Sequence, residues 1–264
     1  MPNLRVNDVD LYYESTGSGD PVFLIHGLGS STLDWEFQIP ALARSHRVIA
    51  MDVRGHGRSA KPPGPYSVAQ FAADATALLR ELHAAPAHIV GLSMGGMIAF
   101  QMAVDSPEAV RSLTIVNSGP EMILRTPEQQ ALIAARHEVV RTHGMAPLAK
   151  VIAGPLFPKP EQDALRQRFE QHVAANDPDA YLASLTAITG WTVADRIAQI
   201  RCPVLIVGSD QDYTPMEWKR AYAAQIPNAR MAVLKDSRHV APLDQPEQLN
   251  RIVLDFLGSQ AVAE

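Results

Sequence analysis

The stretch AHIVGLSMGGMIAFQMAV (residues 87–104) holds one serine, Ser93, between glycines at the junction of two different patterns. Its first residues, AHIV, are a short apolar run typical of a buried strand, and the run from Gly96 to Val104 favours a helix. A serine at a sharp strand-to-helix turn needs neighbours without side chains, because Cβ atoms would otherwise collide across the turn. The stretch therefore predicts a strand, a tight turn and a helix, with the Ser93 hydroxyl raised into a cleft.

Five further short apolar runs, like AHIV, are typical of buried strands. They are PVFLIHG, HRVIAMD, RSLTIVN, PVLIVG and ARMAVL, which begin at residues 21, 46, 111, 203 and 229. Helical patterns lie between most of them, and runs that are apolar on both faces are typical of strands covered on both sides. We therefore expect an α/β fold with a mostly parallel sheet and a functional site at the carboxyl ends of its strands. A β-hairpin is also expected, from Arg5 to Val9 and from Leu11 to Ser15.

The segment 121–189 interrupts this alternation of expected strands and helices. It contains helical patterns such as KPEQDALRQRFEQHVAA but no convincing strand, and its prolines limit the length of each helix. We expect a helical lid at 121–189, inserted into a core domain formed by 1–120 and 190–264.

Composition narrows the functional class. The 264 residues carry a net charge of −5 without a cluster of Lys and Arg on one helical face, which argues against a nucleic-acid partner. The first residues lack the pattern of a signal peptide, and no stretch has the ~18 apolar residues needed to span a bilayer. We expect a cytoplasmic protein without a membrane partner, whose oligomeric state the sequence leaves open. The single cysteine, Cys202, is expected to be a small core residue.

A catalytic role for Ser93 requires two further side chains from other parts of the chain. A serine hydroxyl is a weak nucleophile at neutral pH, so it requires a base and a carboxylate that orients the base. The favoured base is His239, because its segment DSRHVAPLDQ follows the last expected strand, and the other eight histidines are expected to be structural or surface residues. For the carboxylate, the segment GSDQDYTP offers both Asp210 and Asp212 after the strand PVLIVG.

The order serine, aspartate, histidine, with each residue after an expected strand, is the order that accompanies a G-x-S-x-G turn. The alternative is a glycine-rich turn with an incidental serine, because the five-residue pattern also matches by chance. Agreement among three distant segments favours the catalytic interpretation.

Acyl transfer also needs donors for the negative charge that develops on the substrate oxygen. HGLG (26–29) follows the strand PVFLI, and its glycines let the backbone approach a ligand closely. We expect the N–H groups of Leu28 and Met94 to form this oxyanion hole, with His26 supporting the loop. DVRGHGRS (52–59) is interpreted as a structural loop, because its glycine spacing fits no phosphate-binding loop.

Several segments together resemble the α/β-hydrolase superfamily: HGLGSSTLDW, MDVRGHGRSAKP, GLSMGGMIAFQMA, GSDQDYTP and DSRHVAPLDQPEQLNRIVLDFL. Within it, the chain is similar to the group of 3-oxoadipate enol-lactonases, cofactor-free haloperoxidase-like esterases and small carboxylesterases. The resemblance implies an eight-stranded, mostly parallel sheet, with the lid inserted after strand six. It also implies Ser93 as nucleophile, His239 as base and Asp212 rather than Asp210 as acid, without a cofactor or a metal. Asp212 stands one residue closer to Pro215 than is common.

The activity implied by this resemblance is hydrolysis of carboxylic esters or lactones through an acyl-enzyme on Ser93. The expected substrates are small to medium, mostly apolar molecules. Carbon–carbon bond hydrolysis and perhydrolysis on the same three residues remain alternatives, and so does a small-molecule sensor that uses the scaffold only for binding. The candidate pocket residues are apolar and lie in the lid or in strand-end loops. They are Trp35, Met122, Leu124, Leu156, Phe157, Trp191 and Val240.

Overall fold

The computed structural model describes residues 3–261, which form one eight-stranded sheet with helices on both faces. The strands are β1 (Asn3–Val6), β2 (Val9–Thr16), β3 (Pro21–Ile25), β4 (Arg47–Met51), β5 (Ala87–Leu92), β6 (Val110–Val116), β7 (Val204–Ser209) and β8 (Ala229–Leu234). Their spatial order is β1-β2-β4-β3-β5-β6-β7-β8, and all neighbours from β4 to β8 pair in parallel. The expected α/β fold with a mostly parallel sheet is therefore confirmed.

The N-terminal hairpin differs from the sequence-based expectation in its turn. Its two strands pair antiparallel with Val6 opposite Val9, so the turn lies at Asn7 and Asp8 rather than between Val9 and Leu11. Asn7 has a φ of +49°, a conformation that asparagine adopts more readily than a β-branched residue does. The alternating pattern predicted the strands but not which polar residue would form the turn.

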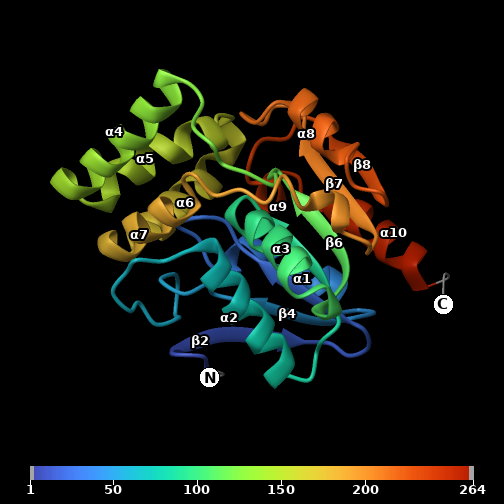
Figure 1. The fold of residues 1–264 in the computed structure, drawn as a ribbon. Helices are drawn as coiled ribbons and strands as arrows, with labels where there is room; N and C mark the ends of the chain where they lie inside the picture. The colour runs from blue at the N-terminus through green and yellow to red at the C-terminus, as the bar shows by residue number, and fades with distance from the viewer. Residues whose placement is uncertain (1–2, 262–264) are drawn as a thin grey trace.

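Helices cover both faces of the sheet. The α-helices are α1 (Gln38–Leu42), α2 (Val68–Glu81), α3 (Met94–Asp105), α4 (Pro127–His143), α5 (Met145–Leu156), α6 (Asp163–Ala174), α7 (Pro178–Ile188), α8 (Met216–Ala223), α9 (Ala241–Asp244) and α10 (Pro246–Ala261). Figure 1 shows α2 and α3 side by side in front of the sheet, whereas α1 and α10 pack together behind it. The short 3-10 turn η1 (Thr32–Trp35) follows β3.

The core lies on both sides of the central strands. Every residue of β5 is buried, and so are residues 94–103 of α3, among which only Gln101 has a polar side chain. A helix of that kind is stable only when other elements surround it completely. The segment that decides the fold therefore lies in the core, with β5 paired between β3 and β6.

The four helices α4 to α7 follow β6 in the chain and precede β7 (Figure 1). They reach back over the loop that follows β3: the Asn176 side chain donates a hydrogen bond of 2.7 Å to the Gly29 carbonyl, and the Tyr181 ring packs against Gly29. A backbone hydrogen bond from Met122 N–H to the Trp191 carbonyl closes the base of this helical segment. Within residues 3–261, no helix combines the length and the apolar character that crossing a membrane requires.

Candidate active site

The turn between β5 and α3 holds Ser93 in a conformation that side chains rarely adopt, with φ +51° and ψ −115°. Neighbouring backbone approaches so closely that glycine is required on both sides. A Cβ on Gly91 would lie 2.3 Å from the Gly95 carbonyl oxygen, and a Cβ on Gly95 would lie 2.0 Å from the Ile25 carbonyl oxygen. The sequence GLSMG thus fixes Ser93 at the strained apex, where its side chain stays partly exposed.

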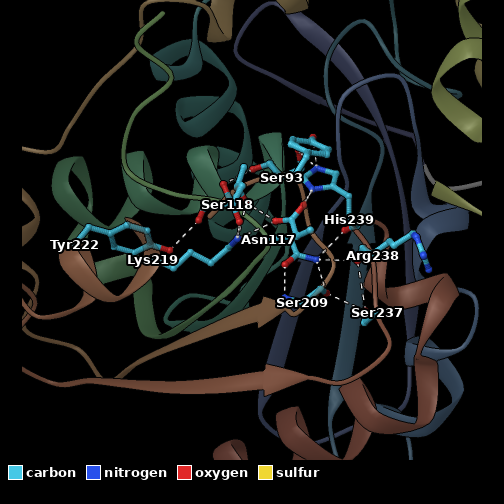
Figure 2. Close-up of polar contacts among 12 residues, drawn as sticks. Ser93, Asn117, Ser118, Ser209, Lys219, Tyr222, Ser237, Arg238 and His239 are labelled. Carbon is cyan, nitrogen blue, oxygen red and sulfur yellow. Dashed lines mark hydrogen bonds and ion pairs between the residues drawn. The ribbon is translucent and has the colours of Figure 1, made fainter. Parts of the chain in front are cut away.

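Three side chains meet at this apex. Ser93 Oγ lies 2.9 Å from His239 Nε2, and His239 Nδ1 lies 2.8 Å from Asp212 Oδ1. Ser93 follows β5, Asp212 follows β7, and His239 lies between β8 and α9, so parallel strands bring all three to one edge of the sheet. Figure 2 shows Ser93 directly beside the His239 ring. This arrangement can pass a proton from the hydroxyl to the imidazole while the carboxylate orients the ring.

Asp212 and Asp210, the two candidate carboxylates, have different surroundings. Asp210 accepts hydrogen bonds from the backbone N–H groups of Asp236 and Ser237, and it therefore anchors the loop that carries His239. Asp212 is the one that contacts the imidazole. The structure thus brings Asp212 to His239 and gives Asp210 a place in the supporting loop.

The Asp212 carboxylate is fully buried and uses both oxygens. Oδ1 faces His239, and Oδ2 accepts hydrogen bonds from Lys219 Nζ at 2.8 Å and from the Thr214 hydroxyl. Burial by itself would raise the pKa of Asp212, but the hydrogen bonds from His239 and Lys219 and the positive charge of Lys219 outweigh it and lower the pKa to about 2. Asp212 therefore stays ionised across the neutral range.

Tyr213, the residue after Asp212, lies over the histidine. Its ring stacks on the His239 ring with centroids 4.2 Å apart, and its hydroxyl lies 2.7 Å from Nε2. The side chain is otherwise 68% exposed. A second hydroxyl therefore competes with Ser93 for the same imidazole nitrogen.

Asn117, the residue after β6, holds the loop that carries His239 in place. Its Nδ2 donates to the His239 carbonyl at 3.0 Å and to Ser209 Oγ at 2.8 Å, and its Oδ1 accepts from the Ser209 N–H at 2.8 Å. Figure 2 shows this amide at the centre of the polar cluster. One side chain thereby links the ends of β6 and β7 to the loop of His239.

The loop after β3 lies beside Ser93, since a Cβ on Gly27 would be 3.6 Å from the Ser93 Cβ. Within residues 3–261, the N–H groups of Leu28 and Met94 show no hydrogen bond to a protein acceptor. Met94 is the first residue of α3, where backbone N–H groups have no partner inside the helix. An oxyanion hole formed by these two N–H groups therefore stays a prediction.

His26 supports this loop from a fully buried position. Its Nε2 accepts a hydrogen bond from the Val53 N–H at 2.9 Å, so the ring proton lies on Nδ1, which donates to the Gly27 carbonyl at 2.7 Å. Burial lowers the pKa of His26 to about 4, which keeps the ring neutral. The imidazole thus ties the loop after β3 to the end of β4.

The segment 52–59 makes buried hydrogen bonds and an ion pair with neighbouring parts of the chain. Asp52 accepts from the backbone N–H groups of Thr32 and Arg58 at 2.7 and 2.8 Å, and the buried Arg54 pairs with Asp74 at 2.8 Å. All these contacts are internal. They hold the turn after β4 against the turn after β3.

The expected pocket residues differ in burial. Trp35 and Phe157 are fully buried, Leu156 and Val240 are almost fully buried, and Met122, Leu124 and Trp191 are only partly buried. A cavity of about 330 Å³ lies between α4, α7 and the loop before α2, where Tyr66, His137 and Arg141 line it, and none of Ser93, Asp212 and His239 does. Within the described residues, no group of three or more His, Cys, Asp or Glu side chains could hold a metal ion.

Sequence reasoning did not find Lys219, Tyr213 or Asn117. The available signals were weak: Tyr213 adjoins Asp212, and Lys219 shares the spacing of the buried Tyr222 and Ala223 on α8. Lysine is almost never fully buried unless it is paired, so the position of Lys219 in the sequence does not by itself indicate a buried partner.

Comparison with known proteins agrees with the fold. The model of the family described as "alpha/beta hydrolase fold" matches residues 20–246. The chain is 33% identical to a protein of Azorhizobium caulinodans named "Putative carbamate hydrolase RutD", over 98% of each chain. It is 29% identical to 3-oxoadipate enol-lactonase 2 of Acinetobacter baylyi, over 95% of this chain and 94% of that one. The crystal structure of the enol-lactonase from Burkholderia xenovorans superposes with a TM-score of 0.91 at 26% identity, over 97% of this chain and 100% of that one.

A parallel sheet with a serine at a strained strand-to-helix turn, and a histidine within reach of it, defines a class of hydrolase. The chain belongs to the α/β-hydrolase fold family, and its relatives include enol-lactonases and esterases.

Proposed function

We propose that the protein is a serine hydrolase that cleaves carboxylic esters or lactones through an acyl-enzyme on Ser93. The observation that carries this proposal is the chain of contacts from Ser93 Oγ to His239 Nε2 and from His239 Nδ1 to Asp212 Oδ1, at 2.9 and 2.8 Å. The esterases and enol-lactonases among its relatives favour the same class of bond.

In the acylation step, His239 takes the Ser93 proton as the oxygen attacks the substrate carbonyl carbon. The N–H groups of Leu28 and Met94 bind the resulting oxyanion; losing one such donor typically costs about 3 to 4 kcal/mol of transition-state stabilisation. The protonated imidazole, stabilised by Asp212, then gives its proton to the leaving alcohol.

In the deacylation step, a water molecule takes the place of the alcohol. His239 removes a proton from the water as its oxygen attacks the acyl carbon, and the same imidazole returns that proton to Ser93. The acid leaves, and the site regains its initial protonation state. No atom outside the substrate, the water and these side chains is needed.

The substrate is proposed to lie between the Ser93 turn and the helical segment 121–189. Met122, Leu124 and Trp191 are the partly exposed apolar candidates for its contacts. They favour a small to medium, mostly apolar acyl or alcohol group, because burial of such a group stabilises the complex by roughly 25 cal/mol per Å².

A second candidate activity is carbamate hydrolysis, favoured by the 33% identity to the protein named as a carbamate hydrolase. Carbamate cleavage also begins with attack on a carbonyl carbon, so it would use the same residues. Carbon–carbon bond hydrolysis and perhydrolysis share them too, and a sensor role would need binding without turnover.

The test combines an active-site probe with a panel of substrates. A fluorophosphonate should label the wild-type protein and should not label Ser93→Ala, while Ser45→Ala, which removes an exposed hydroxyl elsewhere, should label as the wild type does. Hydrolysis of p-nitrophenyl esters from acetate to decanoate, of γ-lactones and of an aryl carbamate then gives the preferred bond and chain length. Absence of both labelling and turnover in the wild type would favour the sensor.

A further inference from the structure

A buried lysine occupies the side of Asp212 that faces away from His239. Lys219 lies on α8, and its Nζ is 2.8 Å from Asp212 Oδ2 and 2.8 Å from the Thr214 carbonyl oxygen. Its third contact is the Thr214 hydroxyl, which in turn donates to Asp212. The three N–H groups of the ammonium therefore have three acceptors, as expected for a charged lysine. Figure 2 shows Lys219 extending from beside Tyr222 towards the centre of the cluster.

The protein makes space for this side chain. Lys219 and Asp212 are both 0% exposed, and a Cβ on Gly208 of β7 would lie 3.1 Å from Lys219 Cδ and 2.4 Å from Met216 Sδ. A buried ammonium is strongly destabilising unless it is paired and hydrogen-bonded. An apolar side chain would fill the same volume without that requirement, so the charge at this place calls for an explanation.

The explanation lies in the row of charges behind the serine. Lys219, Asp212 and His239 follow one another, with the carboxylate between the two nitrogen groups. A fixed positive charge favours the ionised carboxylate and opposes a second positive charge on the imidazole. The first effect preserves the ionised aspartate, and the second preserves the neutral histidine. The proposed mechanism uses both of these states.

We propose that Lys219 is a positioning residue that keeps Asp212 ionised and turned towards His239, and that its charge extends the activity of the enzyme to lower pH. This inference rests on the proposed function. Lys219 touches neither substrate nor reacting atoms, and it acts only through Asp212.

Within residues 3–261, no second lysine or arginine pairs with the Asp212 carboxylate, although Arg136 of α4 acts electrostatically on the neighbouring Tyr213. Tyr213 from the loop after β7 and Tyr222 from α8 are phenols, which stay neutral below about pH 10. Asn117 and Ser118, at the end of β6, are uncharged. Arg238 precedes His239, but Figure 2 shows its side chain pointing away from Ser93. Lys219 is therefore the cation that contacts the carboxylate.

The experiment measures kcat/KM for a p-nitrophenyl ester from pH 4.5 to 9. Lys219→Met removes the charge and keeps most of the volume, whereas Lys219→Arg keeps the charge. Lys235→Met, at an exposed lysine, is the control for the change in net charge. We expect the acid limb of the profile to move by about one pH unit to higher pH in Lys219→Met. In Lys219→Arg and Lys235→Met it should stay within about 0.3 unit.

Circular dichroism and a thermal midpoint accompany each profile. If Lys219→Met does not fold, Lys219→Gln gives the same comparison, because its amide donates hydrogen bonds without a charge. A folded uncharged variant with the wild-type acid limb would overturn the inference and leave a purely structural role. An inactive wild-type protein would instead contradict the proposed function, so the two failures are distinguishable.

Discussion

At the scale of single residues, two hydroxyl groups lie within hydrogen-bond distance of one nitrogen: His239 Nε2 is 2.9 Å from Ser93 Oγ and 2.7 Å from Tyr213 OH. A neutral imidazole that donates through Nδ1 to Asp212 has a single lone pair at Nε2. The proposed base is therefore shared between the proposed nucleophile and a residue that the mechanism does not use. The leaving alcohol and the attacking water must also reach Nε2, where the tyrosine hydroxyl now lies.

Removing that hydroxyl should increase activity. One neutral hydrogen bond is worth about 0.5–1.5 kcal/mol, so Tyr213→Phe should raise kcat/KM for a p-nitrophenyl ester by about 2- to 10-fold. Tyr13→Phe, in β2, serves as the control and should be unchanged. A loss of activity of tenfold or more in Tyr213→Phe would mean that the hydroxyl assists the reaction.

The residues of the site were predictable to different degrees. Ser93 and His239 could be proposed from a motif and from their places after strands, because parallel strands bring such positions to one edge. The choice between Asp210 and Asp212 could not be made from spacing, since it depends on the path of the loop between β7 and α8, residues 210–215. Lys219 and Tyr213 were missed because their contacts arise from that same path.

At the scale of elements, the junction of β5 and α3 shows why one sequence pattern decides the fold. Gly91 lets β5 lie against the first turn of α3, and Gly95 lets that turn lie against the backbone at the end of β3. The apolar runs predicted the strands well, because burial on both faces leaves a continuous signal. The ends of the hairpin strands were less certain, since polar turn residues such as Asn7 carry little pattern.

Gly95→Ala should destabilise the protein strongly. Its Cβ would lie 2.0 Å from the Ile25 carbonyl oxygen, so β3 or α3 must shift. We expect a loss of about 3 kcal/mol or more in the free energy of unfolding, measured by urea titration. Gly154→Ala in α5, where nothing lies within 4 Å, should instead stabilise by about 0.5–1 kcal/mol. Equal effects at the two positions would contradict the close approach.

At the scale of the whole molecule, several buried histidines are kept neutral by the fold. Burial lowers the pKa of His26 and His88 to about 4, and that of His56 to about 3. Below about pH 6.5 the unfolded chain binds protons that the folded protein excludes, so these groups lower stability as pH falls. Burial raises the pKa of Asp34 to about 6, so the folded protein binds a proton there at a pH where the unfolded chain does not. This proton uptake increases stability as the pH falls from 6 to 4.

Stability should therefore fall in mild acid. Each of the three histidine pKa shifts lowers the free energy of unfolding by on the order of 3 kcal/mol once the pH is below the folded-state pKa. The opposite shift of Asp34 offsets the effect of about one histidine. Urea titrations at pH 7, 5.5 and 4.5 should show a net loss of several kcal/mol. His88→Gln should reduce this pH dependence. An unfolding free energy that stays constant from pH 7 to 4.5 would show that these rings are not held neutral.

The most direct test of the proposed mechanism is to trap its covalent intermediate. A p-nitrophenyl ester is mixed with the wild-type protein, the reaction is quenched in acid within the first turnover, and the digested protein is mapped by mass spectrometry. The account predicts an acyl group on the peptide that contains Ser93, and none on that peptide in Ser93→Ala. Turnover of the ester with no acylated Ser93, or with the acyl group on another residue, would contradict it.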